Sequence, residues 1–128
     1  MVPLRSFLSL GGAPLEAPAG AQELKEIEAR VRGAGGEIVS LLKSGSAYYS
    51  PAGAALRMVE SVLFDEKEVF AASVLCRGEY GLRDVFCGVP VVLGRAGIER
   101  VIEHQISAAE REALHQSADR VRRLIADF

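Results

Sequence analysis

The spacing of apolar residues predicts a long helical region near the N-terminus. From Ala21 to Lys43, apolar residues recur at alternating steps of three and four, which places them on one face of a helix; they are Leu24, Ile27, Val31, Ala34, Ile38 and Leu41. Three glycines, Gly33, Gly35 and Gly36, interrupt this region, and each costs about 1 kcal/mol in a helix interior relative to alanine. We therefore predict two helical pieces, 21–32 and 35–43, with a bend or a close contact between them.

Extended segments are predicted in the middle of the chain. Residues 68–77, 85–93 and 98–103 are rich in apolar residues and are separated by glycine-containing turns, and residues 4–10 are a further candidate strand. Both faces of 68–77 are mostly apolar, which predicts that this strand is covered on both sides. Pro90 has no N–H to donate, so we expect part of 85–93 to lie at an edge or to bulge there.

Two more helices complete the predicted fold. Residues 51–64 carry one apolar face, formed by Ala52, Ala55, Leu56, Val59, Val62 and Leu63. Ser107 and Glu110 form the capping-box pattern at the start of the last helix, whose predicted buried stripe is Leu114, Ala118, Val121, Ile125 and Phe128. These elements predict an α+β domain in which helices pack on an antiparallel sheet.

Composition limits the classes of function. The chain has 128 residues, 49% hydrophobic and 25% charged, with a net charge of −2. This length corresponds to one domain with a real core, and the charge favours neither nucleic acid nor an anionic membrane as a partner. No signal peptide is apparent, and no apolar stretch approaches the length of a membrane span.

Cysteine and histidine give no strong sign of catalysis or of a metal site. Cys76 and Cys87 lie in predicted strands, so we expect buried thiols rather than a disulfide or a metal pair, and a cytoplasmic location fits. His104, at the end of a predicted strand, and His115, predicted on the exposed side of the last helix, are each a lone histidine, which favours surface or capping roles over catalysis. No cluster of metal ligands is predicted.

The stretch from Lys43 to Ala52 joins two predicted helices and is crowded with small and hydroxyl side chains. Ser50-Pro51 has the pattern of a helix start, with serine as the cap and proline at the first helical position. Gly45-Ser46 offers a tight bend and a free hydroxyl. Exposed N–H groups at a helix start can hold a carboxylate, so this corner is either a small-anion site or a plain junction between helices.

Several motifs together resemble the C-terminal, substrate-binding half of the NAD-dependent malate and lactate dehydrogenase family. They are Met1-Val2-Pro3-Leu4, the block 32–39, the stretch 43–52, Gly78-Glu79-Tyr80-Gly81 and Gly88-Val89-Pro90-Val91. Their order and spacing extend the resemblance over residues 1–128. The Gly-Ser-Ala-Tyr-Tyr sequence is most similar to malate dehydrogenases of the lactate-dehydrogenase-like type.

The resemblance implies a site at this corner. Ser46, with Gly45, is expected near the substrate carboxylate, and Ser50 and Pro51 are expected towards the nicotinamide of NAD. The family's catalytic histidine belongs to a Gly-His-Gly-Asp motif just before the Met-Val-Pro-Leu sequence, so no catalytic residue is assigned here. The nucleotide-binding domain is likewise missing, and the chain is expected to be a severed half that binds no NAD and is inactive alone.

Three functions remain open on the sequence. The first is the substrate-binding and oligomerisation domain of a malate dehydrogenase, with the missing domain, malate or oxaloacetate, and further copies in a dimer or tetramer as partners. The second is the same domain of a lactate or other 2-hydroxy-acid dehydrogenase. The third is an interaction module that has kept the fold without the chemistry.

Overall fold

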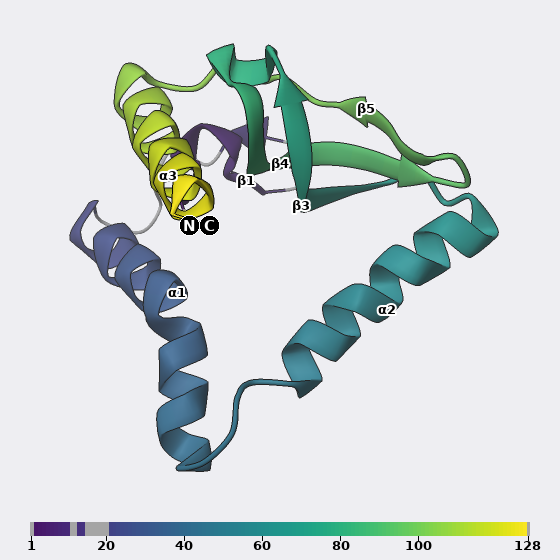
Figure 1. Cartoon of the computed structure of the whole chain (residues 1–128). Coiled ribbons are helices and arrows are strands. Elements are labelled where there is room, and N and C mark those ends of the chain that lie inside the picture. The colour runs from purple at the N-terminus through teal and green to yellow at the C-terminus, as the bar shows by residue number, and fades with distance from the viewer. Residues whose placement is uncertain (1, 11–12, 15–20, 128) are drawn as a thin grey trace.

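Figure 1 shows the computed structural model of the chain, in which residues 2–10, 13–14 and 21–127 are described. The predicted α+β class is confirmed. The longer elements are the helices α1 (Ala21–Leu42), α2 (Tyr49–Phe64) and α3 (Ala108–Ala126), and the strands β3 (Glu68–Arg77), β4 (Arg83–Gly94) and β5 (Gly97–Val101). Short elements are the 3-10 turns η1 (Arg5–Phe7) and η2 (Glu79–Gly81) and the paired strands β1 (Ser9–Leu10) and β2 (Ala13–Pro14).

The three longer strands form one antiparallel sheet in the order β3-β4-β5. Pro90 therefore lies in the central strand, directly before the pairing with β5, which covers only Val91 to Gly94. Among the described residues the part of β4 up to Pro90 pairs with β3 alone, so the predicted edge position is confirmed for that part of β4. The carbonyl oxygen of Pro90 accepts from the N–H of Ile102 at 2.8 Å, so the missing N–H of Pro90 faces the same side, where the pairing with β5 ends at Val101. The carbonyl of Ile102 instead accepts from the hydroxyl of Tyr80 at 2.7 Å, which is why proline is tolerated here.

The core lies between this sheet and α3. Leu114 and Ala118 of α3 are buried, as predicted from the stripe, and they join a cluster of buried residues from the sheet and η2: Ala72, Cys76, Tyr80, Leu82, Val85, Cys87, Val89 and Val91. Ile125 is 59% exposed, so the predicted stripe was wrong at that residue, because the last turns of α3 extend past the buried cluster. Phe128 lies outside the described residues.

The opposite face of the sheet is open. Val69, Leu75 and Phe86 are exposed although all three are apolar, and Leu75 pairs directly with Phe86 across β3 and β4. The prediction that β3 is covered on both sides was therefore wrong for this chain. The physical reason is that the buried cluster, including the α3 residues, lies on one face of the sheet alone.

Helix α1 is one continuous helix, not the two pieces predicted from its glycines. Its axis changes direction partway along (Figure 1), so the predicted bend is present. A Cβ added at Gly33, Gly35 or Gly36 would meet no atom within 4 Å, so close packing does not explain these glycines. An ion pair of 3.0 Å between Arg30 and Glu37 links the turns on either side.

Helix α2 contacts the sheet through its C-terminal half. The hydroxyl of the fully buried Ser61 donates to the carbonyl of Leu93 at 2.6 Å and accepts from the N–H of Glu68 at 3.3 Å. Much of the predicted apolar face is exposed instead, including Leu56, Val59 and Leu63.

Among the helices that the structure describes, none combines the length and apolar character needed to cross a membrane.

Candidate functional site

The corner between α1 and α2 begins where α1 ends at Leu42. The N–H of Lys43 donates to the carbonyl of Val39 at 3.1 Å, and the backbone of Lys43 has a positive φ of 62°. Gly45 has a φ of 86°, a value that an L side chain rarely adopts and glycine adopts freely. The backbone conformation therefore favours glycine at the predicted bend, and Gly45 turns the chain just before Ser46.

Helix α2 begins two residues earlier than predicted. Tyr48 precedes the first turn, Tyr49 is the first helical residue, and no side chain caps the helix. Ser50 is therefore not the cap, and Pro51 occupies the third helical position. Proline is tolerated there because the N–H groups of the whole first turn lack partners inside the helix, and the first helical hydrogen bond runs from Ala52 to the carbonyl of Tyr48 at 2.9 Å.

The side chains of this corner are open to solvent. Ser46 and Ser50 are exposed, and neither hydroxyl forms a hydrogen bond with any residue that the structure describes. Tyr49 is 84% exposed, and its ring lies 4.8 Å from the ring of Tyr48, centre to centre. The corner stands at the far end of α1 and α2 from the sheet (Figure 1).

This corner contains no histidine or carboxylate, the side chains that most often transfer protons. It offers two serine hydroxyls and the backbone N–H groups of Tyr49 and Ser50, which suit a carboxylate or the polar edge of a ring. The described part of the chain contains antiparallel sheets only, whereas a dinucleotide is usually held by parallel βαβ units. The described residues therefore lack the architecture that usually holds a whole dinucleotide.

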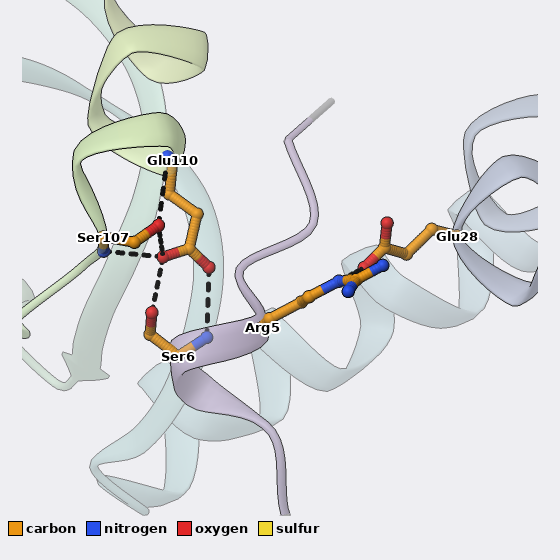
Figure 2. A network of polar contacts seen from close by, with 5 residues as sticks. All are labelled: Arg5, Ser6, Glu28, Ser107 and Glu110. Carbon is orange, nitrogen blue, oxygen red and sulfur yellow. Dashed lines mark hydrogen bonds and ion pairs between the residues drawn. The ribbon is translucent and has the colours of Figure 1, made fainter. Parts of the chain in front are cut away.

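A second polar centre joins the N-terminal segment to α3, as Figure 2 shows. The capping box predicted at α3 is confirmed, since the hydroxyl of Ser107 accepts from the N–H of Glu110 at 3.2 Å while the Glu110 carboxylate accepts from the N–H of Ser107 at 2.8 Å. The same carboxylate also accepts from Ser6, through the backbone N–H at 3.0 Å and through the hydroxyl. Ser6 thus extends the cap to a residue distant in sequence.

These contacts favour the ionised form of the Glu110 carboxyl. Partial burial raises the pKa of its carboxyl, but the hydrogen bonds from Ser6 and Ser107 outweigh that effect and lower the pKa from 4.5 to about 2. Nearby, Arg5 forms an ion pair with Glu28 of α1 (Figure 2), and the hydrogen bond from Arg5 lowers the pKa of Glu28. The N-terminal segment is therefore bound by carboxylates of two helices.

The two histidines have structural contacts. The ring of His104 lies 4.1 Å from that of Phe7, centre to centre, and its backbone N–H donates to the Tyr80 hydroxyl at 3.2 Å. His115 was predicted on the exposed side of its helix, but it is half-buried, and its Nε2 lies 2.9 Å from the carbonyl oxygen of Tyr80. Neither histidine forms a hydrogen bond or an ion pair with a carboxylate in the described part of the chain.

Both cysteines are buried free thiols, as predicted. Burial raises the pKa of Cys76 and of Cys87, which disfavours the reactive thiolate. Within the ranges that the structure describes, no group of three or more histidine, cysteine, aspartate or glutamate side chains is placed to hold a metal ion. The cytoplasmic location inferred from these thiols stays a prediction.

Some of these features could not be found from the sequence. The capping box is a local pattern, but Ser6 lies 104 residues from Glu110, and no pattern links the two positions. The hydrogen bonds of buried Ser61 were also missed, because a serine within an apolar helix gives no sign of its partner on another element.

Comparison with known proteins gives consistent matches. Residues 12–128 match the alpha/beta C-terminal domain of lactate/malate dehydrogenase. The chain is 45% identical over 127 residues to malate dehydrogenase 1 of Anaeromyxobacter dehalogenans, which covers 99% of this chain and 41% of that protein. It is 46% identical over 125 residues to a malate dehydrogenase of Bacillus thuringiensis, covering 98% and 40%.

Solved structures show the same similarity. The malate dehydrogenase of Salinibacter ruber superposes with a TM-score of 0.93 at 43% identity, covering 99% of this chain and 41% of that one. A lactate dehydrogenase of Eimeria maxima, solved with NADH and oxamate, gives a TM-score of 0.92 at 33% identity, covering 98% and 39%. The chain thus spans about two fifths of the length of these relatives.

Proposed function

Because this chain belongs to the lactate/malate dehydrogenase family through the alpha/beta C-terminal domain, we propose that it is the substrate-binding domain of an NAD-dependent malate dehydrogenase. In the complete enzyme this domain would take part in the interconversion of malate and oxaloacetate. The proposal assigns residues 1–128 to that single domain and places NAD binding mainly in a separate nucleotide-binding domain.

One observation supports malate as the substrate class. Identity to proteins named malate dehydrogenase reaches 45–46% over nearly the whole chain, and a malate dehydrogenase structure reaches 43%. Lactate dehydrogenase structures are 33–35% identical, a range that two other malate dehydrogenase structures, at 32% and 36%, share. The alternative, a lactate dehydrogenase, has support from the TM-score of 0.92 with the Eimeria maxima enzyme. An interaction module without chemistry is a third possibility, and the assay of a complete enzyme separates it from the first two.

In the proposed site, Ser46 binds the substrate. Its hydroxyl, free of partners among the described residues, donates a hydrogen bond to a carboxylate oxygen of malate or oxaloacetate. Gly45 supports this position because its φ of 86° turns the chain between α1 and Ser46. A charge-assisted hydrogen bond of this kind orients the substrate as well as binding it.

Ser50 and Pro51 are proposed to face the nicotinamide. They lie in the first turn of α2, where the exposed hydroxyl of Ser50 can meet the polar edge of the ring and Pro51 can pack beside it. When bound, the nicotinamide supplies or accepts the hydride. The corner contains no histidine, so we place the catalytic histidine in the nucleotide-binding half.

The exposed apolar surfaces suit two further partners. One is the nucleotide-binding domain, and the other is a second copy of the chain in a dimer or tetramer. Leu41 at the end of α1 is 75% exposed and Phe64 at the end of α2 is 70% exposed, and burial of such apolar side chains between chains is favourable.

The DNA upstream of the Met1 codon provides a direct test. A coding sequence in the same frame that ends in Gly-His-Gly-Asp and specifies a dinucleotide-binding fold would support the proposal. An upstream stop codon in that frame, with no such domain encoded nearby, would favour the interaction module instead. In either case, we expect the isolated 128-residue chain to leave NADH unoxidised in the presence of oxaloacetate.

A further inference from the structure

A cavity of about 260 Å³ lies between α1, α3 and the N-terminal segment, and it shares no lining residue with the corner at Ser46. It is lined by Val2, Arg32, Ala113, Gln116, Ser117 and Arg120. Two guanidinium groups, from different helices, thus contribute to one small cavity, and no carboxylate is among its lining residues. Such convergence of cations costs free energy unless an anion or solvent compensates it.

Neighbouring carboxylates are already engaged. Glu28 lies near enough to Arg32 for the Arg32 charge to help lower the Glu28 pKa, but its hydrogen-bonding partner is Arg5. Glu112 accepts from the side-chain amide of Gln116 at 3.0 Å. Among the residues that the structure describes, neither Arg32 nor Arg120 takes part in an ion pair, so both guanidinium groups can bind a ligand.

A larger cavity of about 600 Å³ adjoins this one. The two share Val2, Arg32 and Ala113, and the larger one is also lined by Arg5, Lys25, Glu28 and Glu110, among others. Figure 2 shows that its two carboxylates are held by Arg5, Ser6 and Ser107. Four cationic side chains therefore line the combined groove, together with two carboxylates that already accept hydrogen bonds. This local excess of positive charge occurs in a chain whose net charge is −2.

We propose that this groove, named here the α1–α3 groove, binds a phosphoryl group, either as free phosphate or on a small phosphorylated compound. Arg32 and Arg120 present planar forks of N–H donors, which match the oxygens of a phosphate in pairs. The hydroxyl of Ser117 supplies a neutral donor beside them. A tetrahedral dianion can engage both guanidinium groups at once, whereas a single carboxylate has one charge and two oxygens to share between them.

The larger cavity distinguishes the two sources of the phosphoryl group. A free phosphate fills only the space between Arg32 and Arg120. A phosphate ester would extend its organic part towards Lys25, in the adjoining cavity. The site is separate from the corner proposed to bind malate, so the inference does not depend on the proposed function.

The test uses the complete 128-residue chain in a phosphate-free buffer. Inorganic phosphate and glycerol 3-phosphate are titrated by calorimetry at constant ionic strength, with sodium chloride as the reference, and backbone amide NMR signals locate the binding site. The variants are Arg32→Gln and Arg120→Gln. The matched control is Arg123→Gln, which removes the same charge from α3 at a residue that lines neither cavity.

We expect saturable binding of phosphate that weakens at least tenfold in each of the two groove variants, the loss of one charge-assisted hydrogen bond, and less than about twofold in Arg123→Gln. Tighter binding of glycerol 3-phosphate would identify a phosphorylated compound as the ligand, and equal or weaker binding would identify free phosphate. Shifts of the Arg32, Ser117 and Arg120 amides in the unmodified chain support the site even if a variant fails to fold. No saturation by about 10 mM, amide shifts confined to other residues, or equal weakening in Arg123→Gln would overturn the proposal.

Discussion

The hydroxyl of Tyr80 donates to the carbonyl oxygen of Ile102 at 2.7 Å, beside the position where Pro90 has no N–H to offer. The same hydroxyl accepts from the N–H of His104 at 3.2 Å. Tyr80 is 2% exposed and has a positive φ of 54°, which few residues other than glycine adopt readily. The Tyr80 side chain therefore supplies hydrogen-bond partners for two backbone groups in the segment that leads from β5 towards α3.

Removing this hydroxyl should destabilise the fold. We expect Tyr80→Phe to lower the free energy of unfolding by about 1–3 kcal/mol, because the Ile102 carbonyl and the His104 N–H each lose a partner. Chemical denaturation monitored by circular dichroism measures this difference. Tyr49→Phe is the matched control, since Tyr49 is 84% exposed, and it should change stability by less than about 0.5 kcal/mol. Equal effects of the two substitutions would contradict the role of Tyr80.

The low pKa of Glu110 predicts an acid dependence of stability. A carboxyl whose pKa falls from 4.5 when unfolded to about 2 when folded stabilises the folded state above pH 4.5, and this contribution disappears as the pH falls towards 2. After allowance for solvent screening we expect about 2 kcal/mol. The advantage of the unmodified chain over Glu110→Gln should thus be large at pH 7 and small near pH 2.5.

Denaturant titrations at these two pH values provide the measurement. Glu23→Gln serves as the control. Glu23 lies in the first turn of α1 and is not one of the residues in the network of Figure 2. A difference between the unmodified chain and Glu110→Gln that stays constant with pH would show that the contacts with Ser6 and Ser107 do not hold the carboxylate in its charged form.

Exposed apolar residues on α1 predict self-association. Ile27, Val31 and Ile38 are all more than a third exposed and lie on one face of the helix, so burial of that face between copies is favourable. We expect light scattering to show a dimer or a larger species. Val31→Glu should shift the chain towards monomer, while Ala29→Glu, elsewhere on α1, should not. A stable monomer at high protein concentration would contradict this account.

The proposed substrate contact of Ser46 can be tested in a complete enzyme. When the chain is fused to the nucleotide-binding half of a homologous malate dehydrogenase, Ser46→Ala should lower kcat/KM for oxaloacetate by about tenfold. The melting temperature should hardly change, since Ser46 is exposed and has no partner in the described part of the chain. Ser44→Ala, at an exposed serine two residues earlier, is the control. An unchanged kcat/KM in Ser46→Ala would leave this corner as a plain junction between helices.

The comparison of sequence and structure shows which features local patterns can predict. The strands 68–77 and 85–93 and the capping box of Ser107 and Glu110 depend on residues close together along the chain, and the structure has all three. The apolar pattern predicted the α+β class, and the resemblance to the family identified the C-terminal domain fold within that class. The site residues Ser46, Gly45, Ser50 and Pro51 came from that resemblance, and their roles stay predictions.

The errors came from properties that depend on the rest of the molecule. The apolar alternation in β3 is typical of a strand covered on both faces, yet Val69 and Leu75 are exposed. The sequence could not show how the missing N–H of Pro90 is compensated either, because the hydroxyl that does so comes from Tyr80, outside the strand. At the corner, helix α2 begins at Tyr49 without a side-chain cap, so a favourable capping residue at position 50 did not determine the boundary.

The measurement that tests the central claim most directly is NADH oxidation by oxaloacetate, recorded for the isolated chain, for the isolated nucleotide-binding half of a homologous malate dehydrogenase, and for the two fused in one polypeptide. Hydride transfer requires cofactor, proton donor and substrate held together, so neither half should turn over substrate above background and the fusion should do so. A correctly folded fusion that binds NADH but does not oxidise it with oxaloacetate would contradict the assignment of this chain as the substrate-binding domain of a malate dehydrogenase.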